Sequence, residues 1–575
     1  MLISSLVSLV LVVIYAWVLA WSLGYHGIFA LVLYILWIVI YNSCWDFYIN
    51  WALDSIYSGD LYNWVELGNG IIINFGYNAN ILSMIIIIIM GIGLFIVTIF
   101  VYVEMWDDKD GSSFILLLLL FIACMGIMAA GSNMMIFYLG WEGIGLVSLF
   151  LINFWSERVR SVKATFKVFC INKIGDCLLF YMICLMVSKC GSCEFDFIES
   201  WVLILNNKYL IFGNIYFNLV NFIAVITVIG GGVKSAQFGF HIWLLEAMEA
   251  PLGASALMHS STLVIAGILL VYKMYYLIEL SPVALGILII WGSWTAVFAA
   301  FIACWQFELK VVLAYSTISS MGFLYMLLGL GAINEMIIYL IIHAFIKMFL
   351  FLVVGLIMTH CNGLQDVRWM GGLLSYMTYG FILYTWGAMA LSGMPYLSGY
   401  YCKVRMWLYM SNSYSLINGV HICMCLNQIF TYIYLIRVGV LVFGGFKRGH
   451  RSIYRIMHPS GLLIISLFIL LFIMLYTAVI WIEYTDYYYS GIKCSILKYI
   501  NCLNYKYAEL NWYGWYSMSL IYIVVLLLLF ILIFIWHGND RYSLRILWHL
   551  LKWFWFILFY ICVWWFECEY KNSVV

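Results

Sequence analysis

The sequence predicts an all-α polytopic membrane protein, and three observations support that fold class. Hydrophobic residues make up 66% of the chain and charged residues only 9%, whereas about a quarter of a soluble domain is charged. Apolar runs of about 18 or more residues recur, and each is long enough to cross a bilayer as a helix. Runs such as Ile85–Met90 and Leu116–Leu120 lack the alternation of a transmembrane β-strand.

The N-terminal third contains five predicted spans and one predicted hairpin. The spans are Leu2–Leu23, Ile28–Tyr41, Ile81–Tyr102, Phe114–Ala130 and Met134–Trp155. Between the second and third of them, Gly68-Asn69-Gly70 separates two apolar runs, which indicates a β-hairpin outside the bilayer. Ser156–Lys167 is basic and is expected to form a loop after the fifth span.

The rest of the chain brings the expected total to about 14 to 16 spans of about 20 residues each. The further spans are Val168–Val187, Phe217–Gly232, Ser255–Leu277, Val283–Trp305, Val311–Gly331, Met336–Met358, Tyr379–Ala390, Ile417–Phe443, Leu462–Ile482, Leu520–Trp536 and Ile546–Trp565. Basic loops favour the inner face of a membrane. Ser156–Lys167 and Lys447–Arg455 should therefore lie together on that face, with the N-terminus on the other.

Lys347 lies deep inside an apolar stretch, with His343 four residues earlier on the same helical face. At 1.5 Å per residue, Lys347 is roughly 18 Å from either end of that stretch, too far for its ammonium to reach water. A lysine at the centre of a span costs about 2.5–3.5 kcal/mol on insertion scales. We therefore interpret the pair as functional, the alternative being that both pack against backbone carbonyls.

Three other ionisable residues in apolar stretches allow two interpretations each. Glu142 is flanked by glycines that permit a close helix approach, although it could also lie near the end of a span. Lys234 follows a triple glycine, Gly230–Gly232, and taken alone it fits a lysine that reaches out from a helix end. His259, taken alone, fits a packed histidine and a proton carrier equally well.

Lys403 follows an interruption at Gly393–Pro395, much as Lys234 follows its triple glycine. The two lysines are 169 residues apart, and Glu142 and Lys310 are 168 residues apart. Interrupted helices at corresponding positions of two halves indicate an ion site near the midplane of a repeat-built transporter.

Six stretches carry most of these residues: GWEGIGLVSLFLINFW, NKIGD, KSAQFGFHIWLLEAMEAPLGASALMHSSTLVIAG, LKVVLAYSTISSMGF, HAFIKMFLFL and LSGMPYLSGYYCK. Together they resemble the subunit 5 family of proton-pumping NADH:ubiquinone oxidoreductase (respiratory complex I), and Mrp-type cation/proton antiporters share many of them. The resemblance implies two inverted five-helix repeats, each with a broken helix. It divides the chain into N-terminal helices with a hairpin (1–112), a first repeat (113–277), a second repeat (283–443) and C-terminal helices (444–575).

The resemblance also implies a chain of ionisable residues that relays protons: Glu142, Asp176, Lys234, His259, His343, Lys347 and Lys403. In it, Glu142 pairs with Lys234, and Asp176 lies on the Glu142 side. The chain departs from the family at three places. Val404 stands where an aspartate usually follows the last lysine, Gly239 replaces a proline before His241, and Asn539–Val575 suggests a shortened or missing lateral helix.

The expected function is proton translocation driven by redox chemistry in partner subunits. By the resemblance, those partners are other complex I membrane-arm subunits, especially a neighbouring antiporter-like subunit, and they carry FMN and iron–sulfur clusters and bind ubiquinone. We expect no cofactor and no metal in this chain, since Cys190–Cys193 has no matching second pair. A net charge of +1 does not suggest nucleic-acid binding. The alternatives are an Mrp-type antiporter subunit and a non-pumping scaffold.

The expected location is the mitochondrial inner membrane, where the protein would contact lipids as a multi-pass chain. The N-terminal residues show no import presequence, and the first apolar run is long enough to remain as a span. The high Phe, Tyr, Trp and Cys content fits a chain made inside a mitochondrion. A bacterial plasma membrane is the alternative.

Overall fold

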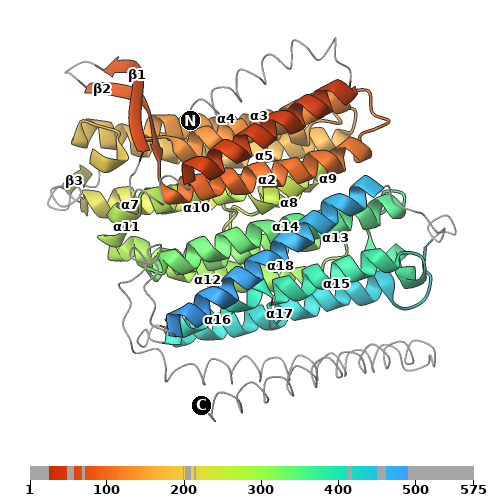
Figure 1. Ribbon diagram of the computed structural model, residues 1–575. Helices are drawn as coiled ribbons and strands as arrows, with labels where there is room; N and C mark the ends of the chain where they lie inside the picture. The colour runs from red at the N-terminus through yellow and green to blue at the C-terminus, as the bar shows by residue number, and fades with distance from the viewer. Residues whose placement is uncertain are drawn as a thin grey trace.

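The computed structural model is a bundle of long helices that run between two ends of the molecule (Figure 1). It describes residues 25–47, 57–67, 71–197, 200, 209–212, 215–394, 397–411, 417–449 and 461–489. Within that part of the chain, ten helices are long and apolar enough to cross a membrane. The multi-pass helical fold is therefore confirmed, while the predicted spans Leu2–Leu23, Leu520–Trp536 and Ile546–Trp565 and the lateral helix lie outside the described residues.

The elements form two successive groups along the chain. The first group is the helix Tyr25–Phe47, β1 (Tyr57–Leu67), β2 (Ile71–Ala79), α2 (Ile81–Glu104), α3 (Gly111–Ala130), α4 (Met134–Ile152), α5 (Val159–Cys190), β3 (Tyr209–Phe212), β4 (Ile215–Asn218), α7 (Leu219–Lys234), α8 (Ile242–Glu246), α9 (Leu252–Ser260), α10 (Leu263–Lys273) and α11 (Tyr275–Glu279). The second group is α12 (Pro282–Ala303), α13 (Leu309–Gly329), α14 (Ile333–His360), α15 (Thr378–Ser392), α16 (Ser398–Ser411), α17 (Ile417–Phe443) and α18 (Gly461–Tyr489).

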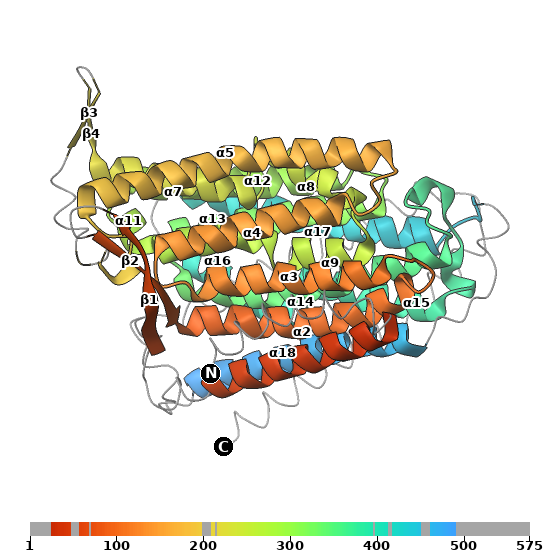
Figure 2. The same cartoon turned by 90° about the horizontal axis from the view of Figure 1, so that it is seen from above.

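The predicted hairpin is confirmed, because β1 and β2 pair antiparallel on either side of residues 68–70. The amide of Asn133 donates to the carbonyl of Asn74 at 2.6 Å and fastens the hairpin to the start of α4. A second hairpin, β3–β4, was not predicted, and it precedes α7 at the same end of the bundle. We call this end, at the left of Figures 1 and 2, the hairpin end. The opposite end, which carries residues 156–167, is the basic-loop end.

Two predicted boundaries were wrong. Most of the predicted loop Ser156–Lys167 is helical, because α5 begins at Val159 and no glycine or proline interrupts that basic segment. The predicted continuous span Ser255–Leu277 is divided into α9, α10 and α11. The first division falls at Ser261 and Thr262, where the Thr262 hydroxyl donates to the Leu257 carbonyl at 3.0 Å. Such local bonds compete with the helical ladder, and an apolar sequence pattern does not reveal them.

The triple glycine lies inside α7 and does not interrupt it. These glycines let neighbouring helices approach. A Cβ atom added to Gly232 would lie 2.4 Å from the Trp291 ring, and one added to Gly231 would lie 2.8 Å from the Gly267 carbonyl. The first interruption therefore follows Lys234 instead of preceding it.

Both interruptions contain a glycine in a left-handed backbone conformation. Gly239 has φ +95° and lies between α7 and α8, so it takes the place of the proline that the family resemblance led us to expect. Gly393 has φ +82° and ends α15 before α16 begins at Ser398. Glycine adopts such angles without steric cost, and each interruption exposes helix-end carbonyls inside the bundle.

Helix α14 joins the two groups. It packs against α2 and α9 of the first group and against α13, α15 and α16 of the second. Helix α18 crosses the bundle obliquely (Figure 1) and contacts α2, α14 and α16. Most of α14 and α13 is consequently buried, and polar side chains on these helices face protein instead of lipid.

We predict that Gly267→Ala lowers the stability of the protein by about 1–3 kcal/mol or more, the usual cost of overpacking. The added methyl would lie 2.2 Å from the Gly231 carbonyl oxygen, and neither helix backbone can move away alone. Gly286→Ala is the matched control, because a Cβ there meets nothing within 4 Å. Thermal unfolding in detergent would measure both, and equal midpoints would contradict the prediction.

Candidate functional site

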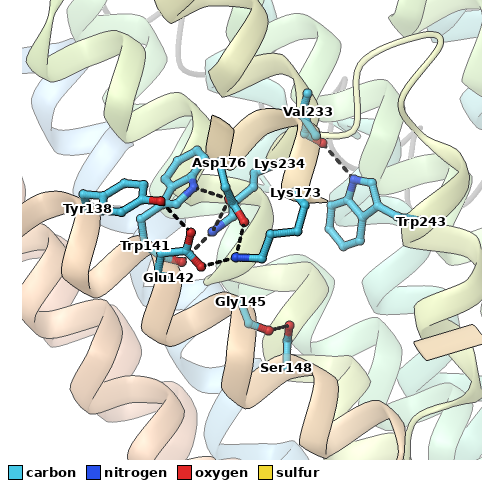
Figure 3. A network of polar contacts seen from close by, with 10 residues as sticks. All are labelled: Tyr138, Trp141, Glu142, Gly145, Ser148, Lys173, Asp176, Val233, Lys234 and Trp243. Atoms are coloured by element: carbon cyan, nitrogen blue, oxygen red, sulfur yellow. Dashed lines mark hydrogen bonds and ion pairs between the residues drawn. The ribbon is translucent and has the colours of Figure 1, made fainter. Parts of the chain in front are cut away.

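The first candidate cluster is built by α4, α5 and the end of α7 (Figure 3). Gly140 brings α4 onto α3, since a Cβ at this position would lie 2.6 Å from the Met128 amide nitrogen. Gly145, one turn further along α4, faces Lys234: its added Cβ would be 3.8 Å from the ammonium. The glycines around Glu142 thus serve helix packing, as predicted.

Lys234 is fully buried at the end of α7, and its ammonium finds acceptors on two neighbouring helices. It donates to the Trp141 carbonyl at 2.5 Å and lies 4.0 Å from the centre of the Trp141 ring. The Asp176 carboxylate is 3.9 Å away. The Trp141 indole donates to the same Asp176 oxygen at 2.7 Å, so one tryptophan orients both charges.

Lys173 occupies the place that the resemblance gave to Lys234. Its ammonium contacts the Glu142 carboxylate at 2.5 Å and the Asp176 carboxylate at 3.1 Å. Tyr138 donates to the other Glu142 oxygen at 2.7 Å. The nearest carboxylate to Lys234 is therefore Asp176, and the expected direct pair of Glu142 with Lys234 is not among the ion pairs within 4 Å.

Sequence reasoning missed Lys173, although a signal was present. It lies three residues before Asp176 in NKIGD, and residues at that spacing share a helix face. The side chains of Glu142 and Lys173 are 22% and 36% exposed, whereas that of Asp176 is 5% exposed. The cluster is thus partly exposed at Glu142 and Lys173, where a small pocket adjoins it, and is buried at Lys234.

His259 lies apart from this cluster, near the end of α9. It is fully buried, and neither ring nitrogen has a hydrogen-bond partner among the described residues. Its ring centre is 6.0 Å from that of Phe351 on α14. Helix α9 therefore presents the histidine to the helix that carries His343 and Lys347.

Lys310 was noted from the sequence only for its spacing, and it is buried at the start of α13. Its ammonium donates to the Met248 and Ala250 carbonyls at 3.2 and 3.0 Å. On the other side of this segment, Glu104 accepts hydrogen bonds from the first amides of α9 at 3.3 Å. These two residues hold the segment that leads into α9 and so position His259.

His343 and Lys347 are both buried on one face of α14 and both face hydroxyl groups of α13. Lys347 donates to the Ser316 hydroxyl, and the His343 Nε2 atom lies 3.4 Å from the Ser320 hydroxyl. Two serines four residues apart on α13 therefore match the histidine–lysine pair four residues apart on α14. Helical spacing in the STISS segment was the signal for them.

Lys403 is held by the second interruption. Its ammonium donates to the Leu391 and Ser392 carbonyls, at 2.8 and 3.2 Å, at the end of α15. The Gln428 amide of α17 also donates to the Ser392 carbonyl. In the described part of the chain, no carboxylate lies within ion-pairing distance of Lys310, Lys347 or Lys403.

Glu246 also has a partner that sequence reasoning did not assign. It forms an ion pair with Lys167 of α5 at the basic-loop end. The pair is partly exposed and links α8 to α5.

A family model described as NADH:quinone oxidoreductase/Mrp antiporter, TM, matches residues 131–430. That range contains every candidate residue from Glu142 to Lys403. The chain belongs to this family. Members of this antiporter-like family in Paramecium tetraurelia and Chondrus crispus, each named NADH-ubiquinone oxidoreductase chain 5, are 34% and 33% identical over 68% and 72% of the chain. The resemblance seen in the sequence is confirmed.

The match extends to bacteria and to a solved structure. NADH-quinone oxidoreductase subunit L of Rickettsia felis is 35% identical over 69% of the chain. The aligned regions span 69%, 62% and 60% of the Paramecium, Chondrus and Rickettsia proteins. A chain in the Mrp complex of a Dietzia species superposes with a TM-score of 0.69 at 24% identity, over 82% of this chain and 50% of that one. This likeness concerns the fold.

We predict that Lys173→Ala lowers stability by about 1–2 kcal/mol, because two carboxylates lose their shared hydrogen-bond donor at a partly exposed site. Lys173→Arg should keep most of that stability, since a guanidinium can donate to both acids. Lys163→Ala, at an exposed lysine of the same helix, is the control. Thermal unfolding in detergent measures all three, and a loss no larger than that of Lys163→Ala would count against the bridging role.

Proposed function

We propose that this chain is a proton-translocating membrane-arm subunit of NADH:ubiquinone oxidoreductase. The observation that carries the proposal is a set of four buried lysines inside apolar helices: Lys234, Lys310, Lys347 and Lys403. Ionisable residues at membrane depth are costly and mark ion pathways. Relatives at 33–35% identity that are named as chain 5 of NADH-ubiquinone oxidoreductase or subunit L of NADH-quinone oxidoreductase support membership of the same complex.

In this proposal protons pass from the Lys234 cluster towards the second half of the chain. Lys173 keeps the Glu142 and Asp176 carboxylates together, and Asp176 attracts a positive charge on Lys234. A change in that pairing would drive a proton onward through His259. Its two ring nitrogens have no hydrogen-bond partner in the described part of the chain, so it is suited to accept a proton on one side and donate one on the other. His343 and Lys347 follow, and Lys403 is the last lysine of the series.

The energy for this movement comes from partner subunits. The chain would belong to an oxidoreductase complex without holding a redox centre itself, and FMN, iron–sulfur clusters and bound ubiquinone would be in its partners. A neighbouring antiporter-like subunit is the proposed contact along the membrane arm.

The proposed internal organisation is two inverted repeats, 113–277 and 283–443, with N-terminal helices 1–112 and C-terminal helices 444–575. Each repeat contains one interrupted helix, α7–α8 and α15–α16. The proposed location is the mitochondrial inner membrane, with the basic-loop end inside by the positive-inside rule. Relatives in eukaryotes and in Rickettsia fit this location and a bacterial plasma membrane equally.

An Mrp-type cation/proton antiporter subunit is the second candidate, because the fold matches a chain of an Mrp complex. Purification of the native complex separates the two. Co-purifying flavin and iron–sulfur subunits support the oxidoreductase, whereas sodium-dependent proton exchange without them supports the antiporter. A non-pumping scaffold, suggested by Val404, would assemble normally and tolerate substitution of its lysines.

We predict that Lys234→Ala lowers NADH-driven proton pumping by the assembled complex at least severalfold, because the buried carrier between Trp141 and Asp176 is removed. Lys109→Ala, at an exposed loop position, is the control and should pump normally. Acidification of inverted membrane vesicles measures pumping, with NADH oxidation recorded in the same sample. Normal pumping by an assembled Lys234→Ala complex would rule out the relay.

A further inference from the structure

One face of α14 carries an unbroken line of polar groups from the middle of the helix to the hairpin end. Its members are four residues apart: Lys347, His343, Tyr339 and Glu335. Residues at that spacing lie one above another on a helix, about 6 Å apart at their Cβ atoms. Glu335 is twelve residues from Lys347, or about 18 Å along the axis. We call this line the α14 stripe.

The inner part of the stripe is buried and its members are close together. Tyr339 is 6% exposed, and its ring centre is 6.1 Å from that of His343. Imidazole and phenol groups both donate and accept hydrogen bonds. A single water molecule can bridge a step of this length between polar groups. The stripe thus offers a continuous series of proton-carrying groups that starts at Lys347.

The stripe ends at a carboxylate that the relay has not yet used. Glu335 lies in the first turn of α14, and its side chain is 19% exposed. One carboxylate oxygen is 3.6 Å from the Arg405 guanidinium of α16. The other oxygen is buried without a hydrogen-bond partner among the described residues. An unpartnered buried carboxylate oxygen costs free energy, and protonation of that oxygen would remove the cost.

Helix α16 lies beside the outer end of the stripe. Arg405 is two residues from Lys403, and α16 packs directly against α14. Val404 lies between the two basic residues, where the family resemblance gives an aspartate. Residues two apart point to different sides of a helix, so Glu335 contacts α16 at Arg405, and its connection to the relay is the α14 stripe.

A purely structural role for Glu335 would be to stabilise the positive end of the α14 dipole and to pair with Arg405. That role accounts for one oxygen of the carboxylate. It does not account for the buried second oxygen, or for the position of the acid at the end of a line of polar groups that begins at Lys347.

We propose that Glu335 is the terminal proton carrier of the second half, an inference that rests on the proposed pumping function. A proton leaves the nitrogen of Lys347, passes along His343 and Tyr339, and an O–H bond forms at the Glu335 carboxylate. That O–H bond then breaks and releases the proton to water at the hairpin end. The carboxylate formed in this way is again attracted to Arg405.

The test is proton pumping by the assembled complex carrying Glu335→Gln, which keeps the shape of the side chain but cannot carry a proton. We expect pumping to fall at least threefold, with most of it retained in Glu335→Asp. Glu279→Gln is the matched control, because Glu279 is an exposed glutamate at the same end of the bundle. Native electrophoresis measures assembly, so that pumping is compared only per assembled complex.

A double variant separates proton transfer from a structural role. Adding Val404→Asp to Glu335→Gln places a carboxylate next to Lys403, and we expect pumping to recover. Failure of recovery in an assembled complex, or unchanged pumping in Glu335→Gln, overturns the inference. Lys347→Met is measured in parallel: reduced pumping there with normal pumping in Glu335→Gln rejects only this inference. Normal pumping in Lys347→Met rejects the relay itself.

Discussion

The structure depends on one physical constraint, which is that a lysine ammonium placed inside a bilayer must have hydrogen-bond acceptors. A continuous helix offers few, because its carbonyls are already bonded within the ladder. Acceptors become free where helices end or break. Lys403 takes the carbonyls at the end of α15, and Lys310 takes those of the segment before α9. The second interruption and Lys403 are therefore two parts of one arrangement, as are the segment before α9 and Lys310, whereas Lys234 takes the Trp141 carbonyl within α4.

The two halves satisfy this constraint in different ways. In the first half, Lys234 and Lys173 face the carboxylates of Glu142 and Asp176, so two positive charges meet two negative ones. In the second half, the acceptors that contact Lys347 and Lys403 are neutral hydroxyl and carbonyl groups. The charges on Lys234 and Lys173 are consequently held by carboxylates, whereas those on Lys347 and Lys403 are held only by neutral dipoles, where the attraction is weaker. Such a difference suits a pathway in which charge is collected on one side and passed on at the other.

Most helix positions and the buried Lys347 were predictable from the sequence. The partners of the buried charges were not, because they depend on how the helices are rotated against one another. Hydropathy located α2, α3, α12, α13 and α17 to within a few residues, because a span needs a long apolar run and little else. Lys347 was identified because its distance from both ends of such a run is fixed by helix geometry. The partner of Lys234 was not predictable in this way. Whether Glu142 or Asp176 lies nearer to Lys234 is set by the rotation of α4 and α5 against α7, which close glycine contacts decide. The break at Thr262 escaped prediction because a local side-chain bond causes it within an apolar segment.

Helix α14 shows why the two halves can act together although their charges are held differently. It has His343 and Lys347 on one face, and it packs against α9, which holds His259, and against α2, which ends at Glu104. Glu104, from the first group of helices, and Lys310, from the second, both form hydrogen bonds with the segment at the start of α9. A displacement of this segment would therefore change both the position of His259 and the contacts of a buried cation. Close packing transmits such shifts because well-packed interiors have few alternative arrangements. The segment at the start of α9 is therefore sufficient to couple the two groups of helices, because both groups form hydrogen bonds with it.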